Sequence, residues 1–320
     1  MGEEVVITEV SSGETIARVK GVSCCSFSPL KKAYVQDTTA ITSLALSYHS
    51  SPPTLITSHM SMAIRYYPLP EEALPSATPY LVYNRQLPKA HSAPILVSTV
   101  STDYSLFATG SSDGIVKVWD AEGGYVTHIY RGHGGPVSAL RFHFSEDKSN
   151  MELWTGSTDG KVRVFDLKDA ASRVVGGSGA AKPKHVLEGH VSVVRGIDVS
   201  DDGKWAVTGG RDKVVLVWDI SGEASGNKKG KGKASGPKVV QTIIAQEQVE
   251  ALGLIRGDLE VKGAGRSRLL CFTGGDRGLV RVWDVLKAQE VVSMQGVEGV
   301  DAEEDEDEDE DEQKGVLHIL

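Results

Sequence analysis

The chain has 320 residues, with 34 lysines and arginines against 43 aspartates and glutamates, and its formal net charge at pH 7 is -9. Eleven of the twelve residues from Asp301 to Glu312 are acidic, and without them the balance is 34 positive against 32 negative residues. The acidity therefore belongs to one segment, which we expect to be solvated. No run approaches about 18 apolar residues, which excludes a membrane-spanning helix. The three cysteines, Cys24, Cys25 and Cys271, exclude a disulfide framework, and with no secretory signal they predict a reducing intracellular compartment.

The first predicted elements are two β-rich runs at residues 5–10 and 12–19, and the last is a run at 315–320. Between them one pattern repeats: a threonine and an aromatic residue ten positions apart, with a turn between two β-favouring runs. The pairs are Thr57 and Tyr67, Thr109 and Trp119, Thr155 and Phe165, Thr208 and Trp218, and Thr273 and Trp283. The first is a weaker copy, because Ser61 stands where the second copy has Asp113. No segment has a long helical period, so the sequence predicts an all-β fold.

Histidines precede three of these pairs at similar distances. They lie 28, 32 and 28 residues before the aromatic residue of the second, third and fourth pair, and they are His91, His133 and His190. A repeat of about 40 to 45 residues with Gly-His and Trp-Asp signals resembles the WD-repeat family. The resemblance implies a β-propeller of four-stranded blades. It implies seven blades, and we expect the chain to begin inside the first blade and to stop inside the last.

The resemblance predicts one propeller domain over residues 1–320. Within it we expect a partial first blade at 1–21, further blades over about 35–296, and the first strand of the last blade at 315–320. Three segments rich in glycine, lysine or acidic residues are predicted to be flexible inserts, at 170–184, 221–238 and 297–314. Surface loops tolerate such insertions at modest entropic cost, so the inserts do not require a function.

In the WD-repeat family a histidine, a strand threonine, a turn aspartate and the aromatic residue form a hydrogen-bonded tetrad inside the blade. Carried over to this chain, the tetrads are His91, Thr109, Asp113 and Trp119; His133, Thr155, Asp159 and Phe165; and His190, Thr208, Asp212 and Trp218. Phe165 has no N–H group, so its tetrad is expected to lack one hydrogen bond. In the next copy Gln246 stands roughly at the histidine position, and Arg277 takes the aspartate position, with Asp276 displaced by one.

The same residue types occur in hydrolase triads. A catalytic constellation is needed once, whereas these residues recur in three repeats, so we expect structural hydrogen bonds and no catalytic residue. The sequence contains no nucleophile elbow, phosphate-binding loop or His-Glu-x-x-His pattern. It therefore predicts a protein that is not an enzyme, with no cofactor, no metal site and no small-molecule substrate.

Two of the inserts carry opposite charge. Five lysines within eleven residues suggest weak contact with RNA or with an acidic protein, and they are Lys228, Lys229, Lys231, Lys233 and Lys238. No aromatic residue is interleaved with them, so base stacking is not predicted. Two explanations of the acidic insert remain: a solvated loop, or a segment that attracts basic parts of other proteins. By the family topology, the two inserts are expected at opposite faces of the propeller.

The segment 125–140, together with the surrounding WD signals, resembles a narrower group, the tandem-propeller subunits of the small-subunit processome in the U-three small nucleolar ribonucleoprotein. The resemblance implies a non-catalytic scaffold of the nucleus and nucleolus that acts in ribosome biogenesis and small-subunit rRNA processing. It implies other WD-repeat propeller subunits as partners and no membrane, with contact to pre-rRNA or snoRNA as a further hypothesis. The candidate partner-binding residues lie beside the turn aspartate and are Ser112, Thr158, Arg211, Asp276 and Arg277.

Two other functions remain as alternatives for a WD-repeat propeller, besides that of a generic adaptor. A substrate receptor of a cullin-RING ubiquitin ligase often has arginine two positions after the Trp-Asp aspartate, whereas this chain has Glu122, Lys168, Ser221 and Leu286 there. An enzyme built on a propeller needs a non-repeating polar cluster around the channel, and none is evident in the sequence. Both alternatives are therefore disfavoured.

Overall fold

The computed structural model describes residues 4–8, 15–20, 40–47, 52–69, 81–144, 151–168, 181–221, 236–255 and 269–295. All regular secondary structure in these ranges is β-strand, so the predicted all-β fold is confirmed. The strands form five four-stranded antiparallel sheets and one two-stranded sheet. We name the four-stranded sheets I to V in chain order.

Each four-stranded sheet is a meander of consecutive strands. Sheet I contains β3 (Ile41–Ser47), β4 (Thr54–His59), β5 (Ile64–Pro68) and β6 (Arg85–Leu87), and sheet II contains β7 (Ile95–Val100), β8 (Leu106–Ser111), β9 (Val116–Asp120) and β10 (Val126–Tyr130). Sheet III contains β11 (Val137–Phe144), β12 (Met151–Ser157), β13 (Lys161–Asp166) and β14 (His185–Glu188), and sheet IV contains β15 (Val194–Val199), β16 (Trp205–Gly210), β17 (Val214–Asp219) and β18 (Lys238–Ile244). Sheet V contains β19 (Val249–Ile255), β20 (Leu270–Gly275), β21 (Leu279–Asp284) and β22 (Gln289–Gln295), and the two-stranded sheet pairs β1 (Glu4–Thr8) with β2 (Thr15–Lys20).

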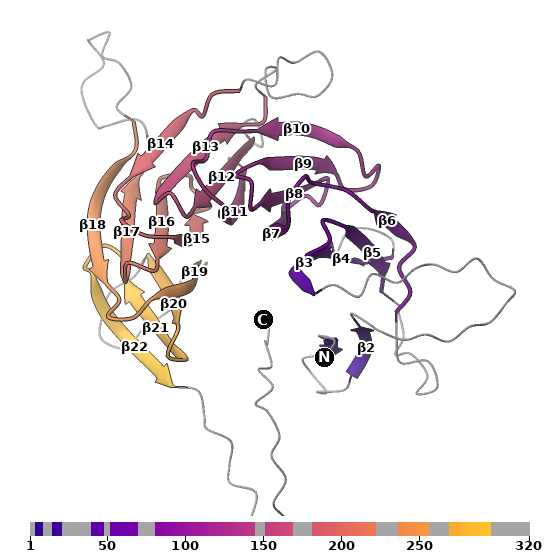
Figure 1. Ribbon diagram of the computed structural model, residues 1–320. Coiled ribbons are helices and arrows are strands. Elements are labelled where there is room, and N and C mark those ends of the chain that lie inside the picture. The colour runs from indigo at the N-terminus through magenta and orange to yellow at the C-terminus, as the bar shows by residue number, and fades with distance from the viewer. Residues whose placement is uncertain are drawn as a thin grey trace, which may run out of the picture.

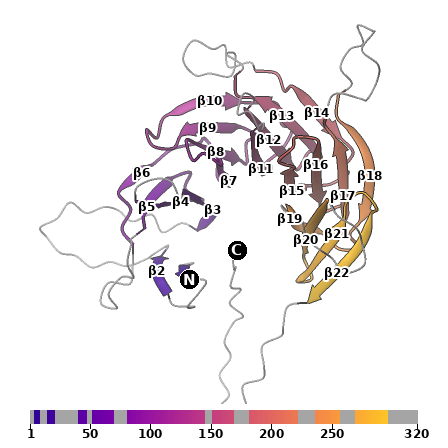
Figure 2. The same ribbon diagram turned by 180° about the vertical axis from the view of Figure 1, so that it is seen from behind.

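The five sheets follow one another in an arc around a common axis (Figure 1). The first strand of each sheet lies nearest the axis and the fourth lies at the outer edge, and the view from behind shows the same order (Figure 2). Radial four-stranded meanders of this kind make a β-propeller. The count of seven blades and the single domain over 1–320 stay predictions.

In sheets II, III and IV the second strand is buried along almost its whole length, and so are most residues of the third strand in sheets II and IV. Both faces of these strands are covered by neighbouring sheets, which explains why they read as continuous apolar and small-residue runs rather than as alternating patterns. A repeated glycine permits the contact: a Cβ added at Gly110, Gly156 or Gly209 would lie within 3 Å of a valine at the start of the next sheet. The second strand therefore needs glycine where the following sheet approaches.

We call the side of each sheet that meets the following sheet its forward face. In sheet IV the forward face includes Val207 and Val215, both 0% exposed, and it packs against β19, β20 and β21. The corresponding residues of sheet V, Phe272 and Val280, are 39% and 40% exposed. A Cβ added at Gly274 would meet only Ala251, at 3.6 Å. Among the described residues, no sheet covers the forward face of sheet V.

A buried carboxylate joins three successive sheets. Asp198, on β15 of sheet IV, pairs with Arg141 Nε of sheet III at 2.9 Å. Its other oxygen accepts a hydrogen bond of 2.8 Å from the backbone N–H of Leu254 in sheet V. The first strands are thus tied to one another across the sheets, which keeps the turns at their ends in fixed relative positions.

Candidate binding face

The complete tetrad is found in sheet IV. The Thr208 hydroxyl is joined to His190 Nε2 at 2.8 Å and accepts a hydrogen bond of 2.9 Å from Trp218 Nε1. His190 Nδ1 donates to Asp212 Oδ2 at 2.8 Å. The histidine side chain is 1% exposed and the aspartate 4%, so each satisfies a polar group that burial would otherwise leave unpaired.

Sheets II and III have a histidine, a threonine and an aspartate at the same positions, but the expected direct bond between histidine and aspartate is missing from both. In sheet III, Arg163 Nη1 lies between the two side chains, 2.7 Å from His133 Nδ1 and 2.8 Å from Asp159 Oδ2, and the histidine and aspartate are 3.6 Å apart. In sheet II, Asp113 accepts a hydrogen bond from the Ser92 hydroxyl instead. Of the three predicted tetrads, that of sheet IV therefore has the direct hydrogen bond between histidine and aspartate.

The residue two positions before the aromatic side chain differs among the three sheets. It is Leu216 in sheet IV, which leaves the aspartate to the histidine, whereas it is Arg163 in sheet III and Lys117 in sheet II. Burial, and then the nearby Lys117, lowers the pKa of His91 to about 4. Burial, and then Arg163, lowers the pKa of His133 to about 4. Both imidazoles are therefore neutral at pH 7.

The hydrogen bond of the aromatic residue depends on whether that residue is tryptophan or phenylalanine. Trp119 and Trp283 donate from Nε1 to Thr109 and Thr273, at 2.9 Å each. Phe165 has no such donor, and the Thr155 hydroxyl is joined to His133 Nε2 at 2.7 Å and donates to the backbone oxygen of Arg163. This tetrad has no hydrogen bond from its aromatic residue, as expected for phenylalanine.

In sheet V the residue inside the blade is not the one expected from the sequence. Gln246 was expected at the histidine position, but it is exposed and has a φ of 65°. Glu247 is 4% exposed and lies 3.7 Å from Arg281 Nη1, and its Oε2 accepts a hydrogen bond from the backbone N–H of Arg277. The buried guanidinium of Arg281 needs a counter-charge, which a glutamate supplies and a glutamine cannot. The side chain of Arg277 is exposed, so it does not take the place of the buried aspartate.

Gly275 makes room for Glu247, and its replacement gives a test of this arrangement. A Cβ at Gly275 would lie 2.0 Å from the carboxyl carbon of Glu247. We expect Gly275→Ala to lower the free energy of unfolding by about 1–3 kcal/mol, since the glutamate must leave its buried position. Gly274→Ala is the matched control, because its Cβ makes only one ordinary contact. Urea unfolding of the two variants checks the prediction, and equal stability would contradict it.

Sheet I uses a histidine that sequence reasoning missed. His59 is 0% exposed, and its Nε2 lies 2.8 Å from the hydroxyl of Thr57, two residues earlier on the same strand. The corresponding positions in sheets IV and V are Gly210 and Gly275. In those sheets the space belongs to His190 and Glu247 from the preceding loop. The sequence did contain an indication of this, because the position two residues after the strand threonine holds serine or glycine in the other four sheets.

The candidate partner-binding residues lie on one face, which we call the turn face. Four of them begin the turn between the second and third strand, and each of these four donates its backbone N–H to the loop before the first strand: Ser112 to Pro94, Thr158 to Pro136, Arg211 to Val193 and Asp276 to Gln248. Met60 makes the same bond to Ala40 and is 50% exposed, so it is a fifth member that the sequence did not reveal. Thr158, Arg211, Asp276 and Arg277 are exposed and Ser112 is half-buried.

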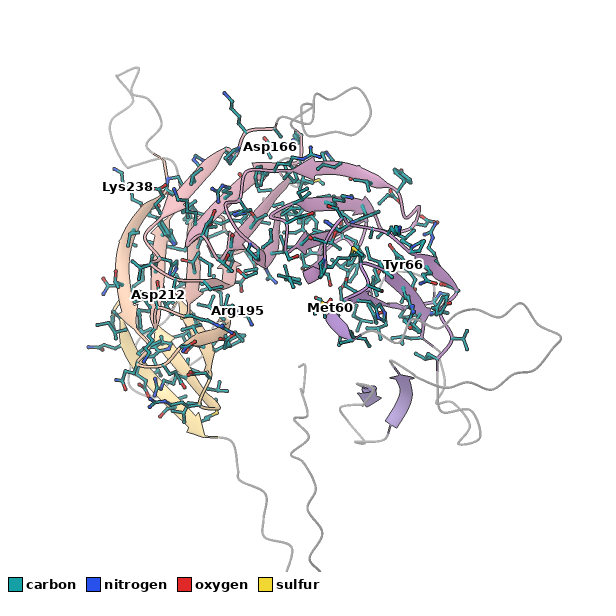
Figure 3. All side chains as sticks on the ribbon, viewed as in Figure 1. Met60, Tyr66, Asp166, Arg195, Asp212 and Lys238 are labelled. Carbon is teal, nitrogen blue, oxygen red and sulfur yellow. The ribbon has the colours of Figure 1, made fainter. Side chains whose placement is uncertain are left out.

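The charged inserts largely fall outside the described residues. Lys228, Lys229, Lys231 and Lys233 lie there, as does the acidic run 301–312. Lys238 is the first residue of β18 and is exposed, so the strand takes in the end of the predicted insert. Figure 3 shows Lys238 and Asp166 at the outer edge of the arc, whereas Arg195 lies at its inner edge.

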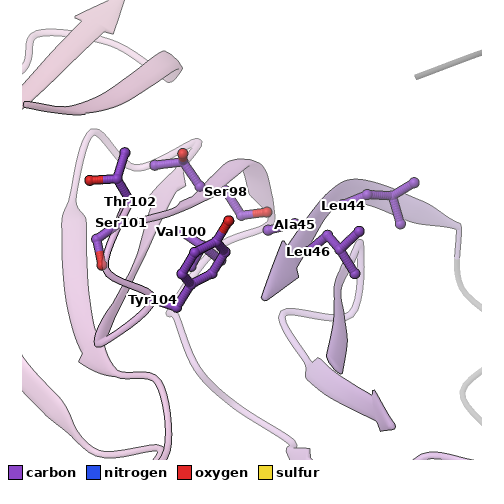
Figure 4. Close-up of a pocket in the computed structure, with 9 residues that line it drawn as sticks. Leu44, Ala45, Leu46, Ser98, Val100, Ser101, Thr102 and Tyr104 are labelled. Atoms are coloured by element: carbon purple, nitrogen blue, oxygen red, sulfur yellow. The ribbon is translucent and has the colours of Figure 1, made fainter. Parts of the chain in front are cut away.

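A cavity of about 270 Å³ opens between the first strands of sheets I and II. Leu44, Leu46 and Val100 supply its apolar part, and serine, threonine and tyrosine hydroxyl groups lie beside them (Figure 4). The Ser98 hydroxyl is already joined to that of Ser43 across the two sheets, at 2.8 Å. The cavity has no charged lining residue and holds no catalytic constellation.

No helix in the described ranges has the length and apolar character needed to cross a membrane. No group of three or more potential metal ligands occurs in the same ranges. Cys271 is buried, which raises the pKa of its thiol to about 12, so the thiol stays protonated at neutral pH.

The model of the WD domain, G-beta repeat, matches residues 83–120, 124–166 and 181–219. This chain is a WD-repeat protein. Each matched repeat begins near the fourth strand of one sheet and ends with the third strand of the next. The tetrad histidine therefore lies within the repeat, on the loop that links two blades. The prediction that the chain contains WD repeats is confirmed.

Several relatives extend this similarity. Transducin beta-like protein 3 of Rattus norvegicus is 31% identical over 215 residues, which cover 67% of this chain and 23% of the relative. U3 small nucleolar RNA-associated protein 13 of Saccharomyces cerevisiae is 28% identical over 191 residues, 58% of this chain and 20% of the relative. Ribosome biogenesis protein WDR12 homolog of Nematostella vectensis is 24% identical over 208 residues, 63% of this chain and 47% of the relative. This WD-repeat chain thus spans about a quarter of the length of the first of these relatives.

Proposed function

We propose that this WD-repeat protein is a non-catalytic scaffold in ribosome biogenesis. The observation that carries the proposal is its similarity, over about two thirds of the chain, to relatives of which one is named for U3 small nucleolar RNA and another for ribosome biogenesis. The finer proposal is that it belongs to the small-subunit processome in the nucleolus and acts in small-subunit rRNA processing. Other WD-repeat propeller subunits are its proposed partners, with contact to pre-rRNA or snoRNA as a further part.

The geometry supports docking better than catalysis. The polar residues that resemble a triad recur in successive sheets and satisfy one another inside the blades, so we propose that the tetrads are structural. The turn face presents a side chain from each of five sheets at the same backbone position. Since the first strands are tied together by buried contacts such as those of Asp198, this face can hold a partner at several fixed points.

Affinity purification of the tagged full chain from cells tests the proposal. We expect pre-rRNA, U3 small nucleolar RNA and other WD-repeat propeller proteins to be enriched at least about tenfold over a tag-only control, and the tagged protein to be seen in nucleoli. A cullin adaptor as the main partner, with no pre-rRNA, would overturn the proposal in favour of a ubiquitin-ligase receptor.

Two variants locate the docking surface within the same experiment. Charge reversal on the turn face, by Asp276→Lys together with Arg277→Glu, is expected to reduce recovery of the propeller partners, because complementary charges at an interface become repulsive. Glu122→Lys is the control, since Glu122 is exposed in the turn between β9 and β10, at the other end of the strands. Equal loss in both variants would contradict a specific role of the turn face.

A further inference from the structure

Two arginines of sheet IV share one glutamate of sheet V at the turn face. Arg195 Nε lies 2.6 Å from Glu250 Oε2, and Arg211 Nε lies 2.7 Å from Glu250 Oε1. Each carboxylate oxygen thus holds one guanidinium. The side chains are 37%, 46% and 28% exposed for Arg195, Arg211 and Glu250, so all three reach solvent.

A β-bulge positions two of these side chains, those of Arg195 and Glu250. The register of every first strand shifts between its first and third residue, which makes the second residue the bulged one. Bulges redirect a side chain and recur beside functional sites. Arg195 and Glu250 are the bulged residues of β15 and β19, and Figure 3 shows Arg195 at the inner edge of the arc. Both residues therefore lie near the start of a first strand, the strand of each sheet nearest the axis of the arc.

Joining the sheets does not require these charges. At the preceding junction the bulged residue is Ser138, whose hydroxyl donates to the backbone oxygen of Val194 at 2.6 Å. Ion pairs that are this exposed contribute only about 0–1 kcal/mol to stability. The three charged side chains thus cost conformational entropy for little stabilisation, which indicates a use beyond the junction.

The arrangement leaves a positive surface with an ordered shape. Burial acts to raise the pKa of Glu250, but hydrogen bonds from Arg211 and Arg195 hold it below its ordinary value, so the carboxylate is ionised at pH 7. One negative charge then faces two positive ones. Because each arginine binds Glu250 through Nε, the Nη1 and Nη2 groups have no partner among the described residues and can donate to an anionic group.

An exposed apolar residue stands beside the arginines. The backbone N–H of Arg211 donates to Val193 O, and that of Val191 donates to Asp212 Oδ2 at 3.1 Å, so the two loops are in contact. Val191 is 90% exposed. Arginine next to an apolar side chain is typical of protein interfaces. The large aromatic residues exposed in the described chain are Tyr125 and Phe272, and neither lies in these loops, so a platform for stacking RNA bases is missing there.

We propose that Arg195, Arg211 and Val191 form a docking site for an acidic and apolar peptide segment of another protein. An aspartate or glutamate of the peptide accepts hydrogen bonds from the outer edges of the two guanidiniums, and an adjacent apolar side chain covers Val191. Glu250 positions both arginines. This inference deepens the scaffold function proposed above and rests on it for the kind of partner.

Fluorescence anisotropy with the purified full chain tests the site. The probes are a labelled twelve-residue peptide of repeated Asp-Asp-Leu, the same peptide with Asn in place of Asp, and a twelve-nucleotide uridine RNA. Because the sequence itself contains an acidic run, the measurement is repeated on a variant in which residues 301–312 are glycine and serine. We expect the acidic peptide to bind with the lowest Kd and the asparagine peptide not to bind.

The variants separate a docking site from general attraction. Arg195→Gln with Arg211→Gln is expected to raise the Kd of the acidic peptide about tenfold or more, because two charge-assisted hydrogen bonds are lost. Arg131→Gln, which removes an exposed charge after β10, should change it less than about twofold. Thermal unfolding of each variant checks that the fold is kept. Equal Kd for both variants, preference for the RNA, or no peptide binding by either form of the chain would overturn the proposal. Since the assay uses purified protein, its failure leaves the purification result for the scaffold function unaffected.

Discussion

Thr208→Val is expected to lower the free energy of unfolding by about 2–6 kcal/mol, although it changes the side-chain volume very little. The Thr208 hydroxyl is the shared partner of His190 Nε2 and Trp218 Nε1, and all three groups are buried. Valine would leave both nitrogens without a hydrogen bond, at about 1–3 kcal/mol for each buried group. Urea unfolding at pH 7, followed by tryptophan fluorescence and circular dichroism, measures the change.

Thr155→Val in sheet III is the matched comparison. Its aromatic neighbour is Phe165, so valine there removes the hydrogen bond of one ring nitrogen, His133 Nε2, together with the bond from the hydroxyl to the backbone oxygen of Arg163. We expect a loss of about 1–3 kcal/mol. Thr242→Val, on the exposed part of β18, should stay within about 0.5 kcal/mol of the parent. If Thr155→Val cost as much as Thr208→Val, the shared hydroxyl would not explain the stability of the blade.

Acid should destabilise the propeller at a pH well above that at which carboxylates protonate. The pKa values of His91 and His133 are about 4 in the folded chain, below the ordinary value of 6.5 that applies to the unfolded chain. As the pH falls, the unfolded chain therefore binds these two protons first. Stability is complete above about pH 6.5 and is lost between 6.5 and 4, by about 2 kcal/mol for each histidine between pH 7 and pH 5.

Urea unfolding at several values between pH 5 and pH 7 measures this loss. The double variant His91→Gln with His133→Gln is less stable at pH 7, but its stability should depend on pH much less over this range. Hydrogen bonds hold the pKa values of Asp113 and Asp159 below 3.8 despite burial, so their contribution is lost only at lower pH and does not interfere. A variant with the same pH dependence as the parent would show that other groups cause the acid sensitivity.

The ten-residue spacing predicted the central hairpin of each sheet because it has a geometric cause. Thr208 pairs with Leu216 across β16 and β17, and Trp218 lies two residues further along, on the same side of the sheet. Its indole therefore reaches the threonine hydroxyl. Any sequence that keeps this spacing and a tight turn places the pair in contact, which is why the fold was readable from sequence alone.

No fixed spacing in the sequence predicts the other residues of the binding face. Glu247 stands one residue after Gln246, which has a left-handed backbone, and the side chain of Glu247 is the one that is buried in the blade. The bulged position holds Thr42, Leu96, Ser138, Arg195 and Glu250 in the five sheets, so no residue type marks it. The pairing of Arg195 with Glu250 joins residues 55 positions apart, and it depends on the angle between two sheets.

The forward faces of the sheets have a consequence for synthesis on the ribosome. Each sheet buries its forward face only when the first strand of the following sheet has been made, as Val137, Val194 and Val249 cover Gly110, Gly156 and Gly209. A chain that emerges from its N-terminal side therefore always presents one freshly completed apolar sheet, which moves along the chain as translation proceeds. At about 5–20 residues per second, a repeat of about 40 residues leaves each such face uncovered for several seconds. The nascent chain thus offers chaperones one binding surface at a time, and a ribosome that stalls between repeats leaves that surface exposed to aggregation.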